Sequence, residues 1–147
     1  FRRVLFRSVR AAVTQGWQLK LCAAEAKWHS DTVSAVMLPT GIAGTEVIAR
    51  AYRRYNLSLG GGLSKVAGKL FRIGHLGDMN EVHLMAAING AEMAMLDCGV
   101  SVQPGSGAAA ASQYWRQHTA PVGLKGLMAS KDAHEKNRVS GQAIVKG

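Results

Sequence analysis

The segment at residues 54–78, RYNLSLGGGLSKVAGKLFRIGHLGD, decides the predicted fold. It contains two short apolar runs, at 57–61 and 69–76, which are joined by the glycine-rich stretch GGLSKVAG. A connection of this length favours antiparallel neighbours, because parallel strands need a crossover of a dozen or more residues. We therefore expect a pair of antiparallel strands here.

The sequence before this pair predicts two helices and one more strand. Residues 9–18 are mostly small or apolar and contain few helix breakers, which is typical of a short helix. Residues 30–38 are rich in β-branched and apolar residues and end at a Pro-Thr-Gly turn, so they predict a strand. Residues 44–56 carry apolar side chains at helical spacing, and Thr45 is a residue that can cap this helix.

The sequence after the pair predicts a long helix and a shorter one. Asp78 is followed three residues later by Glu81, the spacing of a capping box, and Gly99 stands where a helix often ends in a left-handed residue. Residues 103–117 begin as a turn and continue as a helix. The apolar face of the long helix consists of Leu84, Ile88, Ala91 and Met95. The whole order predicts an α+β fold, a small antiparallel sheet with helices packed on one side.

Composition and charge restrict the class of protein. The chain has 147 residues, 48% of them hydrophobic, and no apolar run approaches the length that crosses a bilayer, so we expect one folded domain. The net charge is +9, of which +3 lies within 1–8 and +3 within 118–147. Basic ends can bind nucleic acid or membranes, or they can be solvated tails. We favour solvated tails and predict neither a nucleic-acid nor a membrane partner.

The two cysteines indicate a compartment. Cys22 and Cys98 form no CxxC pair, and no clear secretory signal precedes them. Isolated cysteines are commonly buried, reduced thiols. The expectation is therefore a cytoplasmic protein.

The glycines do not form a known phosphate-binding motif. A Walker loop needs a glycine five residues before Gly68-Lys69, but Leu63 occupies that place. The dinucleotide fingerprint fails because Lys65 stands where the third glycine after Gly60 belongs. The five histidines are scattered without metal-ligand spacing, and no serine lies in a nucleophile elbow, so we predict neither a metal site nor a hydrolytic triad.

Arg72 is the candidate functional residue of the second predicted strand. Side chains alternate along a strand, so Arg72 shares a face with Leu70 and Gly74, while His75 belongs to the other face. A guanidinium beside an apolar wall and an open space can hold a carboxylate in a bidentate pair. The alternative is a structural arginine that pairs with an acid such as Asp78 or reaches into water.

Three quoted segments resemble one enzyme family. They are SDTVSAVMLPTG at 30–41, RYNLSLGGGLSKVAGKLFRIGHLGDMNEV at 54–82 and AAINGAEMAMLDCGVSVQPGSGAAAA at 86–111. Together they resemble the C-terminal part of the serine–glyoxylate and alanine–glyoxylate aminotransferases, over about residues 9–116. These are class V, fold-type I enzymes that use pyridoxal phosphate.

The resemblance implies a site and a function. It implies that Arg72 binds the carboxylate of an amino- or keto-acid substrate, and that Gly60, Gly61 and Gly62 are backbone neighbours of that substrate. It implies transfer of an amino group from serine or alanine to glyoxylate by a homodimeric enzyme. The lysine that attaches pyridoxal phosphate matches no position of this chain, so we expect no catalytic or cofactor-binding residue here, and we expect the isolated chain to be inactive.

The resemblance also implies a domain organisation. Residues 9–117 correspond to the small C-terminal domain of the family, whereas 1–8 do not resemble it. Residues 118–147 are expected to form a basic, weakly structured tail. Two other interpretations remain open: a non-catalytic α+β binding domain, and a nucleic-acid-binding domain. The second is disfavoured because Phe71 alone does not make an aromatic platform for bases.

Overall fold

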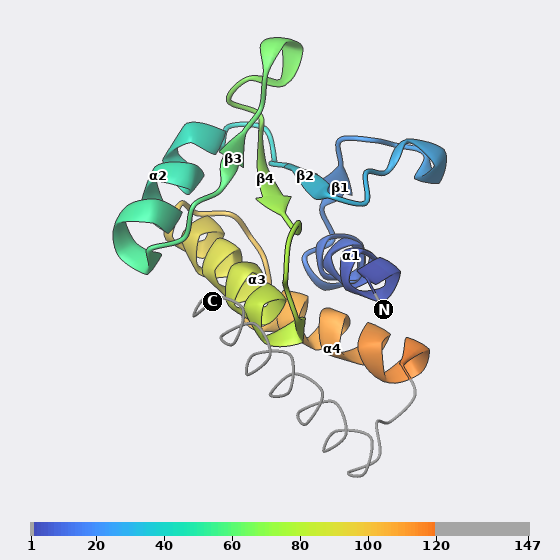
Figure 1. Cartoon of the computed structure of the whole chain (residues 1–147). Helices are drawn as coiled ribbons and strands as arrows, with labels where there is room; N and C mark the ends of the chain where they lie inside the picture. The colour runs from blue at the N-terminus through green and yellow to red at the C-terminus, as the bar shows by residue number, and fades with distance from the viewer. Residues whose placement is uncertain (1, 120–147) are drawn as a thin grey trace, which may run out of the picture.

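The computed structural model describes residues 2–119, whose strands form one four-stranded antiparallel sheet in the order β1-β2-β4-β3 (Figure 1). The strands are β1 (Lys20–Leu21), β2 (Val33–Met37), β3 (Gly60–Gly61) and β4 (Leu70–Gly74). The two central strands have five residues each, and the two outer strands have two. The predicted antiparallel pair on either side of the glycine-rich connection is therefore confirmed as β3 and β4.

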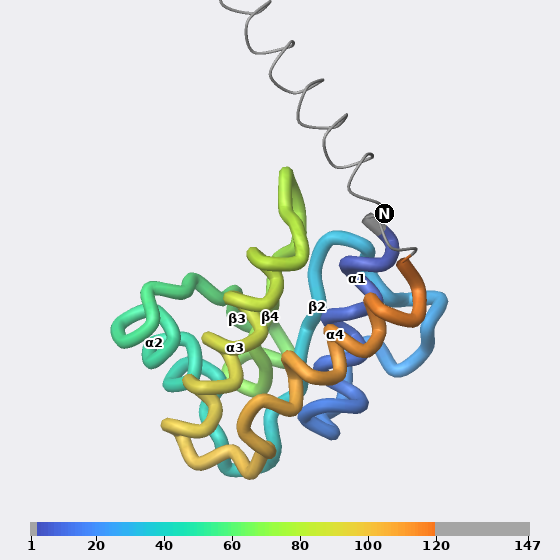
Figure 2. The backbone as a smooth tube through the Cα atoms, turned by 90° about the horizontal axis from the view of Figure 1, so that it is seen from below, coloured from blue at the N-terminus to red at the C-terminus, as the bar shows by residue number. Residues whose placement is uncertain are grey.

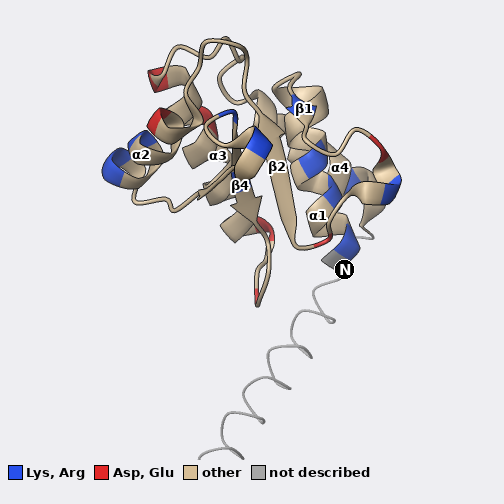
Figure 3. Cartoon of the chain, turned by 90° about the horizontal axis from the view of Figure 1, so that it is seen from above, with Lys and Arg blue, Asp and Glu red and all other residues tan. Residues whose placement is uncertain are grey.

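The helices pack on one side of this sheet. They are α1 (Arg2–Ala11), α2 (Gly44–Tyr55), α3 (Glu81–Asp97) and α4 (Ser106–His118). A π-helical turn, Ala12–Gly16, continues α1, and two short 3₁₀ turns lie at Ala26–Trp28 and Ser64–Val66. From below, α3 and α4 lie in front of the strands (Figure 2), and from above β2 and β4 lie in front of α3 and α4 (Figure 3). The predicted α+β fold is confirmed.

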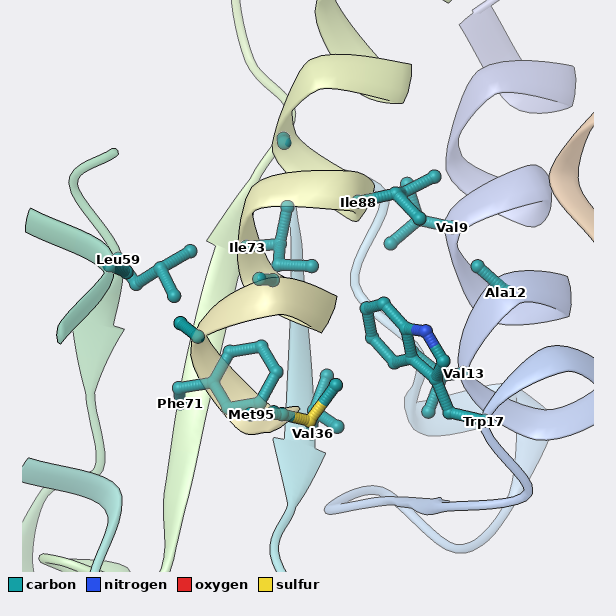
Figure 4. Packing of buried hydrophobic residues seen from close by; sticks show 14 of the residues in the cluster. Val9, Ala12, Val13, Trp17, Val36, Leu59, Phe71, Ile73, Ile88 and Met95 are labelled. Carbon is teal, nitrogen blue, oxygen red and sulfur yellow. The ribbon is translucent and has the colours of Figure 1, made fainter. Parts of the chain in front are cut away.

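The hydrophobic core lies between the sheet and the helices. Phe71 and Ile73 of β4 and Val36 of β2 are all but completely buried, as their alternation along the strands predicts. Figure 4 shows these side chains meeting residues of the helical layer. The helical residues labelled there are Val9, Ala12, Val13, Ile88 and Met95, and the labelled Trp17 directly follows the π-helical turn.

Glu92 is a buried acid that joins three parts of the helical layer. Its carboxylate accepts hydrogen bonds from the indole Nε1 of Trp17 (2.7 Å) and from the backbone N–H groups of Gly107 (2.9 Å) and Gly105. The two glycines lie at the start of α4, where the first N–H groups of a helix have no partner within the helix. Glu92 therefore holds the N-terminus of α4 against α3 and the end of the π-helical turn.

The start of α3 differs from the sequence prediction. Asn80, not Asp78, caps the helix: its side chain accepts a hydrogen bond from the N–H of His83 (3.1 Å), and the His83 ring accepts one from the N–H of Asn80. The reason is a turn at Gly77, whose φ of +91° leaves Asp78 exposed before the helix begins. The predicted end is confirmed, because Gly99 has a φ of +83°.

The cap of α2 was also predicted wrongly. Thr45 lies inside the helix, and the residue at the cap position is Ala43, whose side chain makes no hydrogen bond. The backbone N–H of Gly44 instead donates to the carbonyl of Gly68 (2.8 Å), so the loop before β4 supplies the acceptor. A hydrogen bond of this kind depends on tertiary structure and leaves no signal in the local sequence.

Helix α1 begins earlier than the helix predicted at 9–18. Leu5 and Ser8 are buried, and the ring of Phe6 stacks on His75 with a centroid distance of 5.0 Å. The helix therefore runs across residue 9, where the sequence resemblance begins. The predicted domain boundary between residues 8 and 9 rests on the resemblance alone and stays a prediction. The predicted tail at 118–147 lies outside the described residues except for its first two positions.

Charge and polarity are distributed unevenly over the described residues. Lys and Arg are concentrated on α2 and around α1 (Figure 3). No helix between residues 2 and 119 has both the length and the apolar character needed to cross a membrane.

The two cysteines differ in burial. Cys98 is half-buried and Cys22 is exposed, so the expected burial is wrong for Cys22, which follows directly after the short edge strand β1.

Candidate substrate-binding site

Arg72 lies at the centre of β4, on the face of the sheet that the helices leave uncovered. Its ladder partners are Ala35 on β2 and Gly60 on β3, so a small residue lies on each side of it. Phe71 and Ile73, its neighbours along β4, point to the core. The alternation predicted from the sequence thus places the arginine on the open face, where it is half-buried.

No acid among residues 2–119 pairs with Arg72. The ion pairs in this part of the chain join other residues, and Asp78 takes part in none of them. The Nε atom of Arg72 is buried and has no hydrogen-bond partner among the described residues. A buried donor without an acceptor is unfavourable by about 1–3 kcal/mol. Among the described residues, Arg72 is therefore not paired with Asp78 or with another acid.

The three consecutive glycines face different surroundings. A Cβ atom added to Gly60 would lie 3.1 Å from Nε of Arg72, whereas one added to Gly61 would lie 3.5 Å from Ile48 of α2. A Cβ added to Gly62 would overlap the carbonyl of Val66. Only Gly60 therefore faces the arginine. The predicted contacts of all three glycines with a substrate stay a prediction.

His75 lies on the opposite face from Arg72, as the sequence predicted. Only 4% of its surface is exposed, and its Nε2 lies 3.0 Å from the hydroxyl of Ser34. Burial lowers the pKa of His75, because desolvation disfavours the charged ring. These contacts connect β4 with β2 and α1, so His75 has a structural place and does not reach the open face.

Sequence reasoning missed a small hollow beside β2. It has a volume of about 260 Å³, and its wall is formed by β2 and by the connection between β1 and β2. Ala35, the ladder partner of Arg72, belongs to this wall, and Arg10 closes one side while bonded to Ser30 and Asp31. The hollow depends on how the 22–32 connection folds back, and this part of the sequence carries no periodic pattern that would predict it.

The lysines of the described residues lie on the surface. The four lysines between residues 2 and 119 are all exposed, and none lines the hollow beside β2. No group of three His, Cys, Asp or Glu side chains in this range is arranged to hold a metal ion. The lysines are Lys20, Lys27, Lys65 and Lys69. What the open face does supply is one arginine suited to an anion.

Solved structures define the class of protein to which this fold corresponds. The pyridoxamine-pyruvate aminotransferase from Mesorhizobium loti has a TM-score of 0.72 and 28% sequence identity, covering 80% of this chain and 30% of that chain. The ureidoglycine-glyoxylate aminotransferase from Bacillus subtilis has a TM-score of 0.71 at 21% identity, over 78% of this chain and 30% of that one, and shows the fold alone. The chain has the fold of an aminotransferase C-terminal domain.

Curated relatives narrow this class. The serine–glyoxylate aminotransferase of Methylorubrum extorquens is 56% identical over 115 residues, which are 78% of this chain and 28% of that protein. The L-aspartate–glyoxylate aminotransferase of Paracoccus denitrificans is 46% identical over 117 residues, 80% of this chain and 29% of that protein. No family model matches the chain. The chain is homologous to a C-terminal region of the serine–glyoxylate and related class V aminotransferases, which confirms the resemblance found in the sequence.

The chain spans a little over a quarter of the length of these relatives, 28% and 29%. Over that region the similarity to aminotransferases does not favour the alternative of a non-catalytic binding domain.

Proposed function

We propose that this chain is the substrate-carboxylate-binding region of an aminotransferase that transfers an amino group to glyoxylate. The observation that carries the proposal is Arg72, a half-buried arginine on the open face of the sheet that no acid of residues 2–119 neutralises. A cation that binds a carboxylate suits the substrates of aminotransferases, which are amino and keto acids. Both substrates of such a reaction carry a carboxylate, so one cation serves both halves of the reaction.

The chemistry of the guanidinium suits this role. Arg72 presents a planar pair of N–H groups that can bind both oxygens of a carboxylate, which fixes the orientation of the substrate as well as its position. A fixed carboxylate restricts the rotation of the neighbouring Cα, whose C–H bond is the one that breaks in transamination. The arginine thus acts as a positioning group that touches the substrate and exchanges no proton with it.

Pyridoxal phosphate is the cofactor that the aminotransferase relatives imply, and when bound it supplies an electron sink for the substrate. The exposed lysines of the described residues do not fit its attachment, so we assign its binding to the part of the relatives that lies beyond the matched 28%. The activity therefore needs that additional part. A homodimer in the cytoplasm remains the expected setting of the intact enzyme.

The relatives suggest the substrates. Glyoxylate appears in the names of both curated relatives, whereas the amino donor is serine in one and aspartate in the other. We propose glyoxylate as the acceptor and serine as the donor, following the relative with 56% identity.

A chimeric enzyme tests the proposal. Residues 9–117 of this chain replace the homologous segment of the Methylorubrum extorquens enzyme, and the parent enzyme serves as the control. We expect the chimera to form glycine from glyoxylate with serine as the donor, and the chain alone to form none. A chimera that folds and binds pyridoxal phosphate like its parent but does not transfer the amino group would overturn the proposal and favour a non-catalytic domain.

A further inference from the structure

The ladder between β3 and β4 brings Gly60 directly opposite Arg72. A Cβ atom placed on Gly60 would lie 3.3 Å from Cβ of Arg72, 3.1 Å from its Nε and 3.5 Å from its Nη2. The near end and the far end of the arginine are therefore both close to the same point. The side chain of Arg72 therefore runs across β3 over Gly60, which has no side chain in its way.

Across residues 2–119, Nε of Arg72 is covered and has no hydrogen-bond partner. Neither terminal nitrogen of the guanidinium is buried without a partner in this part of the chain. The terminal nitrogens are the ones that remain able to bind a ligand. Directly opposite residues on antiparallel strands normally have Cβ atoms about 4.5–5.5 Å apart, whereas a Cβ at position 60 would lie only 3.3 Å from Cβ of Arg72. Even a methyl group there therefore requires the arginine to shift by a few tenths of an ångström.

We propose that Gly60 is a positioning residue for Arg72: the missing side chain at position 60 lets the guanidinium lie across β3 and sets the direction in which its terminal nitrogens point. A side chain at position 60 turns the guanidinium away. The carboxylate part of this inference rests on the proposed function, whereas the orientation of Arg72 does not.

Position 60 tolerates other residues as far as the backbone is concerned. Gly60 is not among the glycines with a positive φ, so an L-residue can adopt its conformation. Valine is favoured in strands and gives no backbone strain there. A substitution at Gly60 is therefore expected to preserve the sheet while it displaces Arg72, which separates a positioning role from a merely structural one.

The neighbouring glycine provides a matched control. Gly61 follows Gly60 on the same strand but faces α2, where an added Cβ makes an ordinary contact of 3.5 Å with Ile48. Gly61→Ala therefore adds the same methyl group to the same strand without approaching the arginine.

The test uses the whole ¹⁵N-labelled chain and the Nε–H signal of Arg72 in NMR, assigned by its loss in Arg72→Lys. In the parent we expect this hydrogen to exchange with water at least about tenfold more slowly than that of the exposed Arg50, because Nε is covered. Gly60→Val should bring its exchange to the rate of Arg50, Gly60→Ala should give an intermediate rate, and Gly61→Ala should leave it unchanged. Melting curves check that each variant is folded. If Gly60→Val does not fold, the exchange rate in Gly60→Ala tests the proposal instead. Slow exchange and an unchanged signal in the folded Gly60 variants would overturn the proposal.

A titration with acetate and with glyoxylate separates this inference from the proposed function. If the parent's Arg72 signals shift saturably with either carboxylate, Gly60→Val should weaken that binding about tenfold, as expected for the loss of about 1.4 kcal/mol of a bidentate contact. Equal binding in parent and variant contradicts positioning. If the parent shows no shift, the carboxylate site is refuted, and the exchange rates still decide whether Gly60 orients Arg72.

Discussion

A single arginine on β4 carries the proposed chemistry, and its substitution gives the most direct prediction. In the chimeric enzyme, Arg72→Ala should lower kcat/KM by about 30- to 1000-fold, which corresponds to the loss of roughly 2–4 kcal/mol from a charge-assisted bidentate pair. Arg72→Lys should restore only part of this, because an ammonium group does not reproduce the planar fork.

Steady-state kinetics and thermal melts on the same three proteins check this prediction. Cofactor binding should survive in the Ala variant. If Arg72 only braces the sheet, the Ala variant will instead melt at a lower temperature and keep a near-normal kcat/KM in its folded fraction.

His75, which directly follows β4, is expected to make stability depend on pH. Burial lowers its pKa in the folded chain below the ordinary value of 6.5, and the positive charge of Arg10 acts in the same direction, while contacts with Asp31 oppose it. Between the lowered pKa and 6.5 the unfolded chain binds more protons than the folded chain. The contribution of His75 to stability is therefore present above pH 6.5, and it is lost progressively as the pH falls below that value.

Urea unfolding between about pH 8 and about pH 5 measures this effect. In His75→Gln the side chain can still bond Ser34 but cannot take up a proton, so the fall of the unfolding free energy on the acid side should be smaller. The other histidines of the chain are unchanged in this variant. An equal fall in parent and variant would exclude His75 as its source.

At the scale of elements, Glu92 determines how the helical layer is held together. Glu92→Ala removes the acceptor for three buried or half-buried donors, and it should lower the free energy of unfolding by about 3 kcal/mol. Glu92→Gln keeps one acceptor oxygen but presents an amide NH₂ to another donor. It should therefore lower the free energy of unfolding by about 1–2 kcal/mol. Exposed Glu46→Gln should change stability by no more than about 0.5–1 kcal/mol. Denaturant unfolding measures these losses. An equal loss of unfolding free energy in Glu92→Gln and Glu46→Gln would contradict the role assigned to Glu92.

The elements that the sequence predicted correctly are those with a clear periodic pattern. β2, β4 and α3 follow from alternation or from a repeated apolar face. Alternation also assigns Arg72 to one face of the sheet, whereas its role as a carboxylate ligand came from the resemblance. β1 was missed because a strand of two residues has no period to detect. Asn80 was missed because the turn at Gly77 moved the start of α3, and Glu92 because an acid inside a helix normally faces water.

At the scale of the whole molecule, several large apolar side chains lie on the surface. Trp28 is 70% exposed, Leu76 is 68% exposed, and Leu63 and Val82 are similarly exposed. These side chains come from three separate parts of the chain, the β1–β2 connection, the β3–β4 connection and the segment that leads from β4 into the start of α3. We expect the isolated chain to bind a dye that reports apolar surface and to associate as its concentration rises. The chimera, in which the rest of the enzyme covers part of that surface, should bind less dye. A clean monomer without dye binding at high concentration, measured by sedimentation, would contradict this.

The shortness of the two outer strands has a further consequence for such association. An aggregate that grows by strand addition needs a row of free backbone N–H and C=O groups along the edge of a sheet, and long, flat edges provide it. Here each edge strand, β1 and β3, offers only two residues, and β3 consists of glycine alone. Copies of this chain can therefore meet through side chains but have little edge on which to build a continuous sheet. Clusters of the isolated chain should dissolve on dilution and should not develop the 4.7–4.8 Å cross-β reflection of amyloid fibres.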